Sequence, residues 1–153
     1  AIKTFTQKVS WKDLDFIIID MPPGTGDTQL TFAQEIKLDG AIIVSTPQEI
    51  ALLDVKRGIK MFDKLGVKII GLIDNMSFFI GDDGKKYPIF GEGGVEKTAT
   101  EFGKEFLGEI PLDPEVGKRG DQGKPIVESN PENKVSKIYL NLANKIKSTY
   151  LEN

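Results

Sequence analysis

Residues 11–27 read Trp-Lys-Asp-Leu-Asp-Phe-Ile-Ile-Ile-Asp-Met-Pro-Pro-Gly-Thr-Gly-Asp, and this stretch decides the fold. Four apolar residues, Phe16 to Ile19, run directly into the carboxylate of Asp20. A short, continuous apolar run of this kind predicts a strand buried on both faces of a parallel sheet. Asp20 would then stand at the carboxyl end of that strand, where open α/β sheets bind ligands. Because a lone buried carboxylate is costly, Asp20 needs a cation or hydrogen-bond donors, and Mg²⁺ carried by a nucleotide is the usual partner at such a position.

The turn that follows, residues 22–26, is suited to an anion. Its two prolines fix the backbone and remove two N–H donors, whereas its two glycines let the main chain approach a ligand and offer bare N–H groups. Such donors suit a terminal phosphate. Asp27 is expected to cap a helix over residues 28–36. For an apolar strand and one Asp alone, a purely structural turn would be the preferred interpretation.

The rest of the chain alternates apolar runs with amphipathic segments. Strands that alternate with helices indicate parallel βαβ units. Strands are predicted over residues 40–46, 67–73 and 106–110, and helices after residue 46, over 92–103 and after residue 130. Asp83-Gly84 between apolar flanks interrupts this rhythm and predicts a β-hairpin insertion near 78–90. We therefore expect an α/β fold in one domain over residues 1–153, with a mostly parallel sheet and flanking helices.

Capping chemistry and spacing place the two longest helices. Thr46, followed by Pro47 and Glu49, predicts a capping box at the start of one helix, and Gly66 predicts its end. Asn130 is expected to cap the last helix, with the next proline as its first residue. The apolar faces are expected at Leu52, Val55, Ile59 and Phe62 in the first and at Val135, Ile138, Tyr139, Leu142 and Ile146 in the second.

Composition excludes several classes of function. The net charge is −3 and the sequence pI is about 5.1, which argues against nucleic acid or an anionic membrane as the main partner. No apolar run approaches the roughly 20 residues that span a bilayer. The chain has no cysteine and no histidine, so it cannot supply disulfides, His-based triads or thiolate ligands. This composition is compatible with the cytoplasm, the compartment that we expect.

The whole of residues 11–27 resembles the signature of the Mrp/ApbC family of P-loop ATPases, relatives of the MinD-type ATPases. The family pattern is Trp, two residues, an aliphatic, Asp, an aromatic or Val, three aliphatics, Asp, any residue, and Pro-Pro-Gly-Thr-Gly-Asp. Shorter matches continue over residues 38–41, 45–48, 51–55, 75–77, 89–94 and 107–114. The resemblance covers nearly the whole chain and implies a P-loop NTPase-type fold, ATP hydrolysis, and a role in iron–sulfur cluster assembly or delivery.

The resemblance also assigns roles to individual residues. Asp20 would hold Mg²⁺ through water, as the Walker-B carboxylate does, and Gly24 would offer its N–H to the γ-phosphate, so these two are the catalytic candidates. The segment Pro22–Asp27 would form a switch that responds to hydrolysis. The implied nucleotide-binding residues are Asp20, Pro22, Pro23, Gly24, Thr25, Gly26, Asp27, Asn75, Pro111 and Asp113.

Asn75 follows a predicted buried strand and carries an amide that can donate and accept toward an adenine edge. In related ATPases an Asn at this place contacts the base, and the loop after the next strand, here 111–114, closes over it. A turn or cap is the alternative for Asn75, and an ordinary loop and helix start is the alternative for Pro111 and Asp113. Adjacent carboxylates at 82 and 83 fit a turn better than a metal site, because they point in different directions.

One departure from the family pattern concerns the phosphate loop. Family members carry Lys-Gly-Gly-Val-Gly-Lys and Ser or Thr near their start, and residues 91–94, Gly-Glu-Gly-Gly, match neither the lysine nor the hydroxyl residue. By analogy, roughly 100 residues before Ala1 would hold this loop and the strands beside the one that ends at Asp20. The chain is thus expected to be the carboxyl-terminal fragment of a longer ATPase domain, incomplete at the N-terminal side of its sheet.

The second departure concerns the cluster ligands. Many members place Cys-x-x-Cys just after Asn-Met-Ser-x-Phe, and two subunits then hold a bridging [4Fe–4S] cluster. Residues 80–84 read Ile-Gly-Asp-Asp-Gly here, and carboxylates are poor ligands for such a cluster. ATP and Mg²⁺ are therefore the expected cofactors, whereas the [4Fe–4S] cluster is implied by the family without cysteine ligands in this chain.

Three hypotheses remain open at this point. The leading one is an Mrp/ApbC-type ATPase of iron–sulfur cluster assembly or delivery, acting as a homodimer with iron–sulfur client or scaffold proteins, without nucleic acid or stable membrane insertion. The second is a nucleotide-gated, MinD-like binding or regulatory module that carries no cluster. The third is an inert truncated product.

Overall fold

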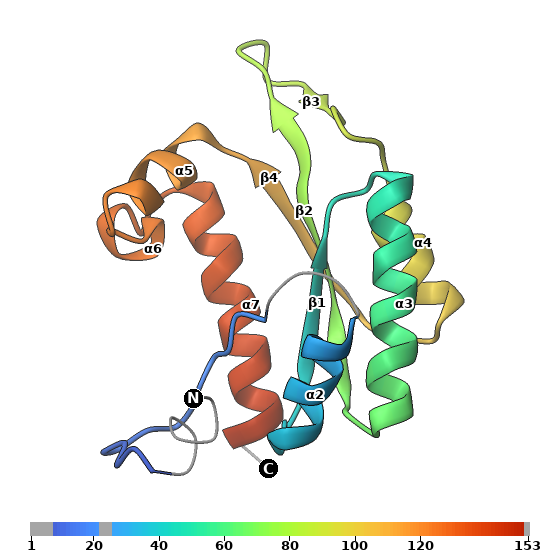
Figure 1. Cartoon of the computed structure of the whole chain (residues 1–153). Coiled ribbons are helices and arrows are strands. Elements are labelled where there is room, and N and C mark those ends of the chain that lie inside the picture. The colour runs from blue at the N-terminus through green and yellow to red at the C-terminus, as the bar shows by residue number, and fades with distance from the viewer. Residues whose placement is uncertain (1–7, 22–25, 152–153) are drawn as a thin grey trace.

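The computed structural model describes residues 8–21 and 26–151, in which helices lie on both faces of one sheet (Figure 1). This arrangement confirms the α/β class. Along the chain the elements are α2 (Asp27–Glu35), β1 (Ala41–Ser45), α3 (Glu49–Leu65), β2 (Ile69–Ile80), β3 (Lys86–Tyr87), α4 (Gly94–Glu101), β4 (Phe106–Leu112), α5 (Pro114–Asp121), α6 (Ile126–Ser129) and α7 (Lys134–Leu151).

The long strand β2 organises the sheet. It pairs in parallel with β1 along one side and with β4 along the other, and its far end pairs antiparallel with β3. Ser45 lies opposite Asp74, and Asn75 lies opposite Ile110. Because parallel strands end at one edge of a sheet, the segments after β1 and β4 and the outer part of β2 meet at the same carboxyl edge.

Two apolar clusters, one on each face of the sheet, form the core. Leu72 of β2 packs with Ile59 and Phe62 of α3 and with Val95 of α4, and the apolar stripe predicted for α3 is confirmed. On the other face, α7 packs against β2 and β4, and its predicted apolar face is also confirmed. The α7 cluster consists of Ile73, Ile110, Val135 and Leu142, with Ile138 and Tyr139 packed against it.

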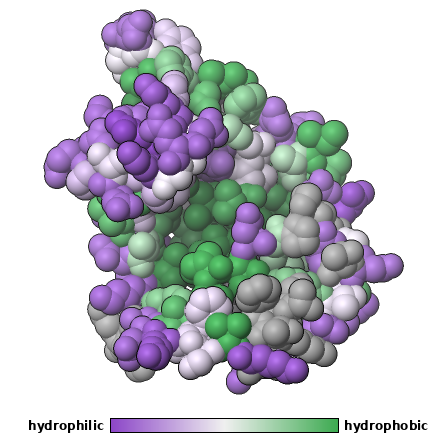
Figure 2. All heavy atoms as spheres, turned by 60° about the vertical axis from the view of Figure 1, so that its left-hand side comes forward, coloured by the Kyte–Doolittle hydropathy of each residue, from purple (hydrophilic) through white to green (hydrophobic). Residues whose placement is uncertain are grey.

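The predicted strand over Phe16–Ile19 is not borne out. This segment is neither helix nor strand; Ile19 is half-buried, and Phe16, Ile17 and Ile18 are exposed, with Ile18 exposed over 84% of its surface. A strand requires a hydrogen-bonded neighbour, and among the described residues β1 pairs only with β2 and leaves its other edge unpaired. Figure 2 shows apolar atoms in a hollow on the side where α7 lies. The predicted burial of this segment is therefore wrong in this structure, because an apolar run cannot supply its own partner strand.

Helix starts differ from the predicted ones. The α2 helix has Gly26 as its N-cap, and Asp27 is its first residue rather than its cap. The α3 helix begins at Glu49 after Gln48, so the capping box predicted at Thr46 is absent; the Thr46 hydroxyl lies 3.5 Å from the Gln48 side-chain oxygen instead. The predicted end of α3 is confirmed, because Gly66 adopts a left-handed conformation with φ 68°.

The last helix also begins later than predicted. Asn130 was expected to cap it, but the side-chain oxygen of Asn133 accepts a hydrogen bond from the Val135 N–H at 2.7 Å, and α7 begins at Lys134. Residues 126–129 form the short helix α6 instead, and Asn130 follows its end. The strand β4 extends to Leu112, beyond its predicted end at residue 110, and the eight-residue helix α5 follows it.

The predicted hairpin is confirmed and stands above the sheet (Figure 1). Phe79 pairs with Tyr87, and Gly84 in the turn has φ 76°. The Asp83 carboxylate accepts hydrogen bonds from the Tyr87 hydroxyl at 2.8 Å and from the Lys85 N–H at 3.0 Å. These bonds lower the pKa of Asp83 and assign it to turn structure, as expected. No helix in the described parts of the chain is long and apolar enough to cross a membrane.

Candidate functional site

The structure brings one group of predicted site residues together, at the carboxyl edge of β2 and β4. Asn75 of β2 lies opposite Ile110, so it neighbours Pro111 and the loop that leads to Asp113. Pro111 is buried within β4, and Asp113 is half-buried as the N-cap of α5. The three residues come from two adjacent strands and the following helix start, which is the expected place for a ligand in an open α/β sheet.

Asn75 has the features of a ligand-binding residue rather than a turn or cap. It lies inside β2, so the turn or cap alternative does not apply. Its side chain is half-buried, and none of the described side chains forms a hydrogen bond with its amide. The next residue, Met76, has φ 55°, a left-handed conformation that costs a non-glycine residue roughly 1–2 kcal/mol. Backbone strain of this kind is often found at functional sites.

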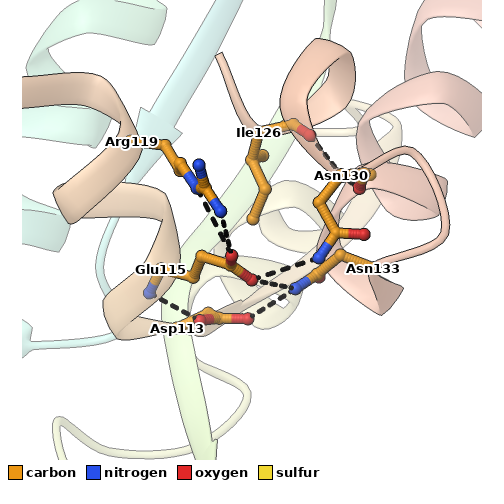
Figure 3. Close-up of polar contacts among 7 residues, drawn as sticks. Asp113, Glu115, Arg119, Ile126, Asn130 and Asn133 are labelled. Carbon is orange, nitrogen blue, oxygen red and sulfur yellow. Dashed lines mark hydrogen bonds and ion pairs between the residues drawn. The ribbon is translucent and has the colours of Figure 1, made fainter. Parts of the chain in front are cut away.

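Asp113 belongs to a polar network that fixes the starts of α5 and α7 (Figure 3). One oxygen accepts a hydrogen bond from the Glu115 N–H at 2.8 Å, and the other accepts one from the Asn133 amide at 3.3 Å. The Glu115 carboxylate accepts further bonds from Arg119 at 3.1 Å and from Asn130 at 3.3 Å. Arg119, together with both amides, lowers the pKa of Glu115. The Asp113 side chain therefore has a structural role, as the helix-start alternative requires.

The signature residues come earlier in the chain, in the segment that leads into α2. Asp20 is exposed, and no described contact joins it to Asn75 or Asp113. Gly26 and Asp27 begin α2, and Pro22, Pro23, Gly24 and Thr25 lie outside the described residues. Within the described ranges, no three acidic side chains gather in a way that could hold a metal ion. The roles of Asp20 and Gly24 with Mg²⁺ and phosphate thus stay predictions.

Two further residues near the edge were missed by the sequence reasoning. Asp74 is 1% exposed, and its Oδ1 has no hydrogen-bond partner among the described residues. Burial, and second the negative charge of Glu109, together raise the pKa of Asp74 to about 6. Ser77 is 4% exposed and donates a hydrogen bond to the Ile110 carbonyl oxygen at 3.2 Å. The only signal in the sequence was an acidic residue directly after the apolar run at Leu72-Ile73.

A mostly parallel sheet between helices, with polar side chains at its carboxyl edge, is the arrangement in which open α/β proteins bind ligands. Residues 1–147 match the model of the ParA family described as NUBPL iron-transfer P-loop NTPase. The chain belongs to this family, and the resemblance to Mrp/ApbC proteins is confirmed.

The chain is similar to an iron-sulfur cluster carrier protein of Aquifex aeolicus, with 45% identity over 153 residues. The match covers 99% of this chain and 42% of the relative, so the chain spans less than half of that protein's length. Among solved structures, it resembles a nucleotide-binding protein of Archaeoglobus fulgidus in complex with ADP (TM-score 0.75, 37% identity, 88% of this chain and 54% of that one). It also resembles the cell division ATPase MinD of Pyrococcus furiosus (TM-score 0.71, 26% identity, 97% and 56%).

Proposed function

We propose that the protein binds and hydrolyses ATP with Mg²⁺ and acts in iron–sulfur cluster assembly or delivery. The family match and the name of the Aquifex relative support the cluster role. One observation carries the nucleotide role: the Asn75 amide is unpaired among the described residues and lies at the carboxyl edge beside the β4–α5 loop. The likeness to an ADP complex at 37% identity supports the same assignment.

In this proposal each group of residues has a separate task. Asn75 donates to and accepts from the adenine edge, and the loop at Pro111 and Asp113 closes beside the base. Asp20 would hold Mg²⁺, Gly24 would offer its N–H to the γ-phosphate, and residues 22–27 would respond to hydrolysis. Bound Mg²⁺ supplies charge neutralisation on the phosphates, and the residues of the chain supply position.

In this proposal the iron–sulfur cluster is cargo and not a resident cofactor. The chain has no cysteine, and Asp83 in the hairpin is already bound by Tyr87 and Lys85, so the residues present do not fit a cluster. Thiolates from elsewhere in the protein or from a client would have to hold it. This absence of cysteine favours a second candidate, a nucleotide-gated, MinD-like module that carries no cluster.

Anaerobic reconstitution with iron and sulfide separates the two candidates. The protein as its gene encodes it is incubated with both, desalted, and measured for iron content and visible absorbance. Stoichiometric iron per dimer supports cluster carriage. A dimer that binds ATP but retains no iron supports the second candidate and rules out carriage by the protein itself.

Hydrolysis is tested by Asp20→Ala in the gene-encoded protein. We expect Mg²⁺-dependent release of phosphate from ATP to fall by about 100-fold, the scale of one lost electrostatic contact in a transition state. Asp82→Ala is the matched control, because Asp82 is an exposed carboxylate in the hairpin turn. Equal rates for both variants would contradict the role of Asp20.

The remaining parts of the proposal concern assembly. We propose that the 153 residues act within one ATPase domain, that the protein forms a homodimer with iron–sulfur clients or scaffolds, and that it works in the cytoplasm. Light scattering with and without a non-hydrolysable ATP analogue tests the dimer, which should gain population with the analogue. Isothermal titration of the isolated 153-residue chain with ATP should show negligible affinity, because the chain contains no phosphate-loop motif.

A further inference from the structure

The pairing of β2 with β4 contains an irregularity directly after Asn75. Asn75 lies opposite Ile110, and the next paired residues are Phe79 and Leu112. From Asn75 to Phe79 is four steps along β2, whereas from Ile110 to Leu112 is two steps along β4. The two additional residues of β2 therefore bulge out of the ladder between these points. Bulges of this kind are used next to active sites to redirect a side chain.

Met76 and Ser77 occupy this bulge and have unusual properties. Met76 is one of two non-glycine residues with positive φ in the described chain, and the other, Asp13, lies outside any helix or strand. Ser77 is 4% exposed, and its hydroxyl donates at 3.2 Å to the carbonyl oxygen of Ile110, the residue opposite Asn75. The hydroxyl thus ties the bulged strand to β4 at the position of Asn75.

We propose that Met76 and Ser77 are positioning residues that hold the Asn75 amide toward the nucleotide base and thereby set the preference for adenine. The inference rests on the proposed function, because it needs Asn75 to contact the base. The left-handed backbone of Met76 ends the regular alternation of β2 after Asn75. The Ser77 hydroxyl then fixes the bulge in one register, so the amide does not have to be ordered when the nucleotide binds.

A structural role alone predicts something different. Ser77 and Thr98 each bury a hydroxyl that donates to a carbonyl oxygen, Thr98 to that of Gly94 at 2.8 Å, and Thr98 is 3% exposed on α4. Loss of either hydroxyl should lower thermal stability by a similar amount. Only the loss of the Ser77 hydroxyl should change the choice between bases. Thr98→Val is therefore the matched control for Ser77→Ala.

The test measures ATP and GTP affinities of the gene-encoded protein by isothermal titration. We expect Ser77→Ala to lower the ratio of ATP to GTP affinity by about tenfold. Thr98→Val should leave this ratio unchanged. Ser77→Thr keeps the hydroxyl and should therefore keep the ratio at the wild-type value. Met76→Gly should also keep the ratio, since glycine adopts positive φ freely, whereas Met76→Val should lower it, because a β-branched residue disfavours this backbone.

Asn75→Ala separates the failure of this inference from the failure of the proposed function. If Asn75→Ala leaves the ratio unchanged, the base contact itself is wrong. If Asn75→Ala lowers the ratio while Ser77→Ala and Met76→Val do not, the contact stands and the positioning role is overturned. If Ser77→Ala fails to fold, the comparison of Met76→Val with Met76→Gly decides, and equal ratios for those two variants would refute the proposal.

Discussion

Replacing Asp74 by Asn tests whether the buried carboxylate at the centre of the sheet weakens the fold at neutral pH. The side chain is 1% exposed, and its pKa is raised from 3.8 to about 6, first by burial and second by the charge of Glu109. An acid with a raised pKa in the folded state stabilises that state most below its unfolded pKa. The stability is lost as the pH rises through the folded pKa.

The two pKa values set the magnitude. A difference of about 2 pKa units corresponds to roughly 3 kcal/mol between the fully protonated and fully ionised limits. Between pH 5 and pH 8, linkage for these two pKa values removes about 1.4 kcal/mol from the free energy of unfolding of the wild-type protein. Asn keeps the shape of the side chain and cannot ionise. The free energy of unfolding of Asp74→Asn minus that of wild type should therefore rise by about 1.4 kcal/mol over the same interval.

Urea unfolding followed by circular dichroism, at unit steps from pH 5 to pH 8 on the gene-encoded protein, measures this difference. Asp82→Asn is the control, because Asp82 is an exposed carboxylate in the hairpin turn rather than a buried one. A difference for Asp74→Asn that stays constant with pH, or that falls as the pH rises, would refute the reasoning. Such a result would mean that Asp74 is ionised at pH 5 in the folded protein.

Three other substitutions test the packing and are measured by urea unfolding. Gly58→Ala should raise the free energy of unfolding by about 0.5–1 kcal/mol, because Gly58 lies in α3 with open space around a new Cβ; a loss would contradict this. Gly71→Ala should lower it by about 1–3 kcal/mol, because the Cβ would lie 2.5 Å from Leu107 Cγ; unchanged stability would show that the strand can move aside. Asn133→Ala should lower it by about 1–2 kcal/mol through loss of the cap on Val135, and unchanged stability would contradict the capping role.

Local periodicity predicted the core of the fold well. The three- and four-residue spacing in α3 and α7 placed Ile59, Phe62, Val135 and Leu142 correctly, because the helical repeat gathers apolar residues on one face whichever element packs against it. The strand predicted over residues 16–19 is wrong, because strand formation depends on the neighbours of a segment. An apolar run becomes a strand only beside a hydrogen-bonding partner, and that partner is a property of the tertiary arrangement.

Only part of the candidate site could be predicted from the sequence. Asn75 could be singled out because its residue type and its place after an apolar run both suit a base contact. The Met76–Ser77 bulge could not, since it depends on the register between β2 and β4. Asn133 was likewise overlooked in favour of Asn130, because both asparagines suit a helix start and only the folded chain shows which one reaches the Val135 N–H.

The Asp113 carboxylate makes the start of α5 and the start of α7 depend on each other. Its two oxygens bind the first turn of α5 and the amide that caps α7, an 18-residue helix lying across one face of the sheet. A ligand that breaks the hydrogen bond between Asp113 and Asn133 would therefore weaken the cap at the start of α7. By thermodynamic reciprocity, a molecule that stabilises the start of α7 would lower the affinity of Asp113 for that ligand. A single side chain thus joins the starts of two helices, α5 and α7, at the carboxyl edge of the sheet.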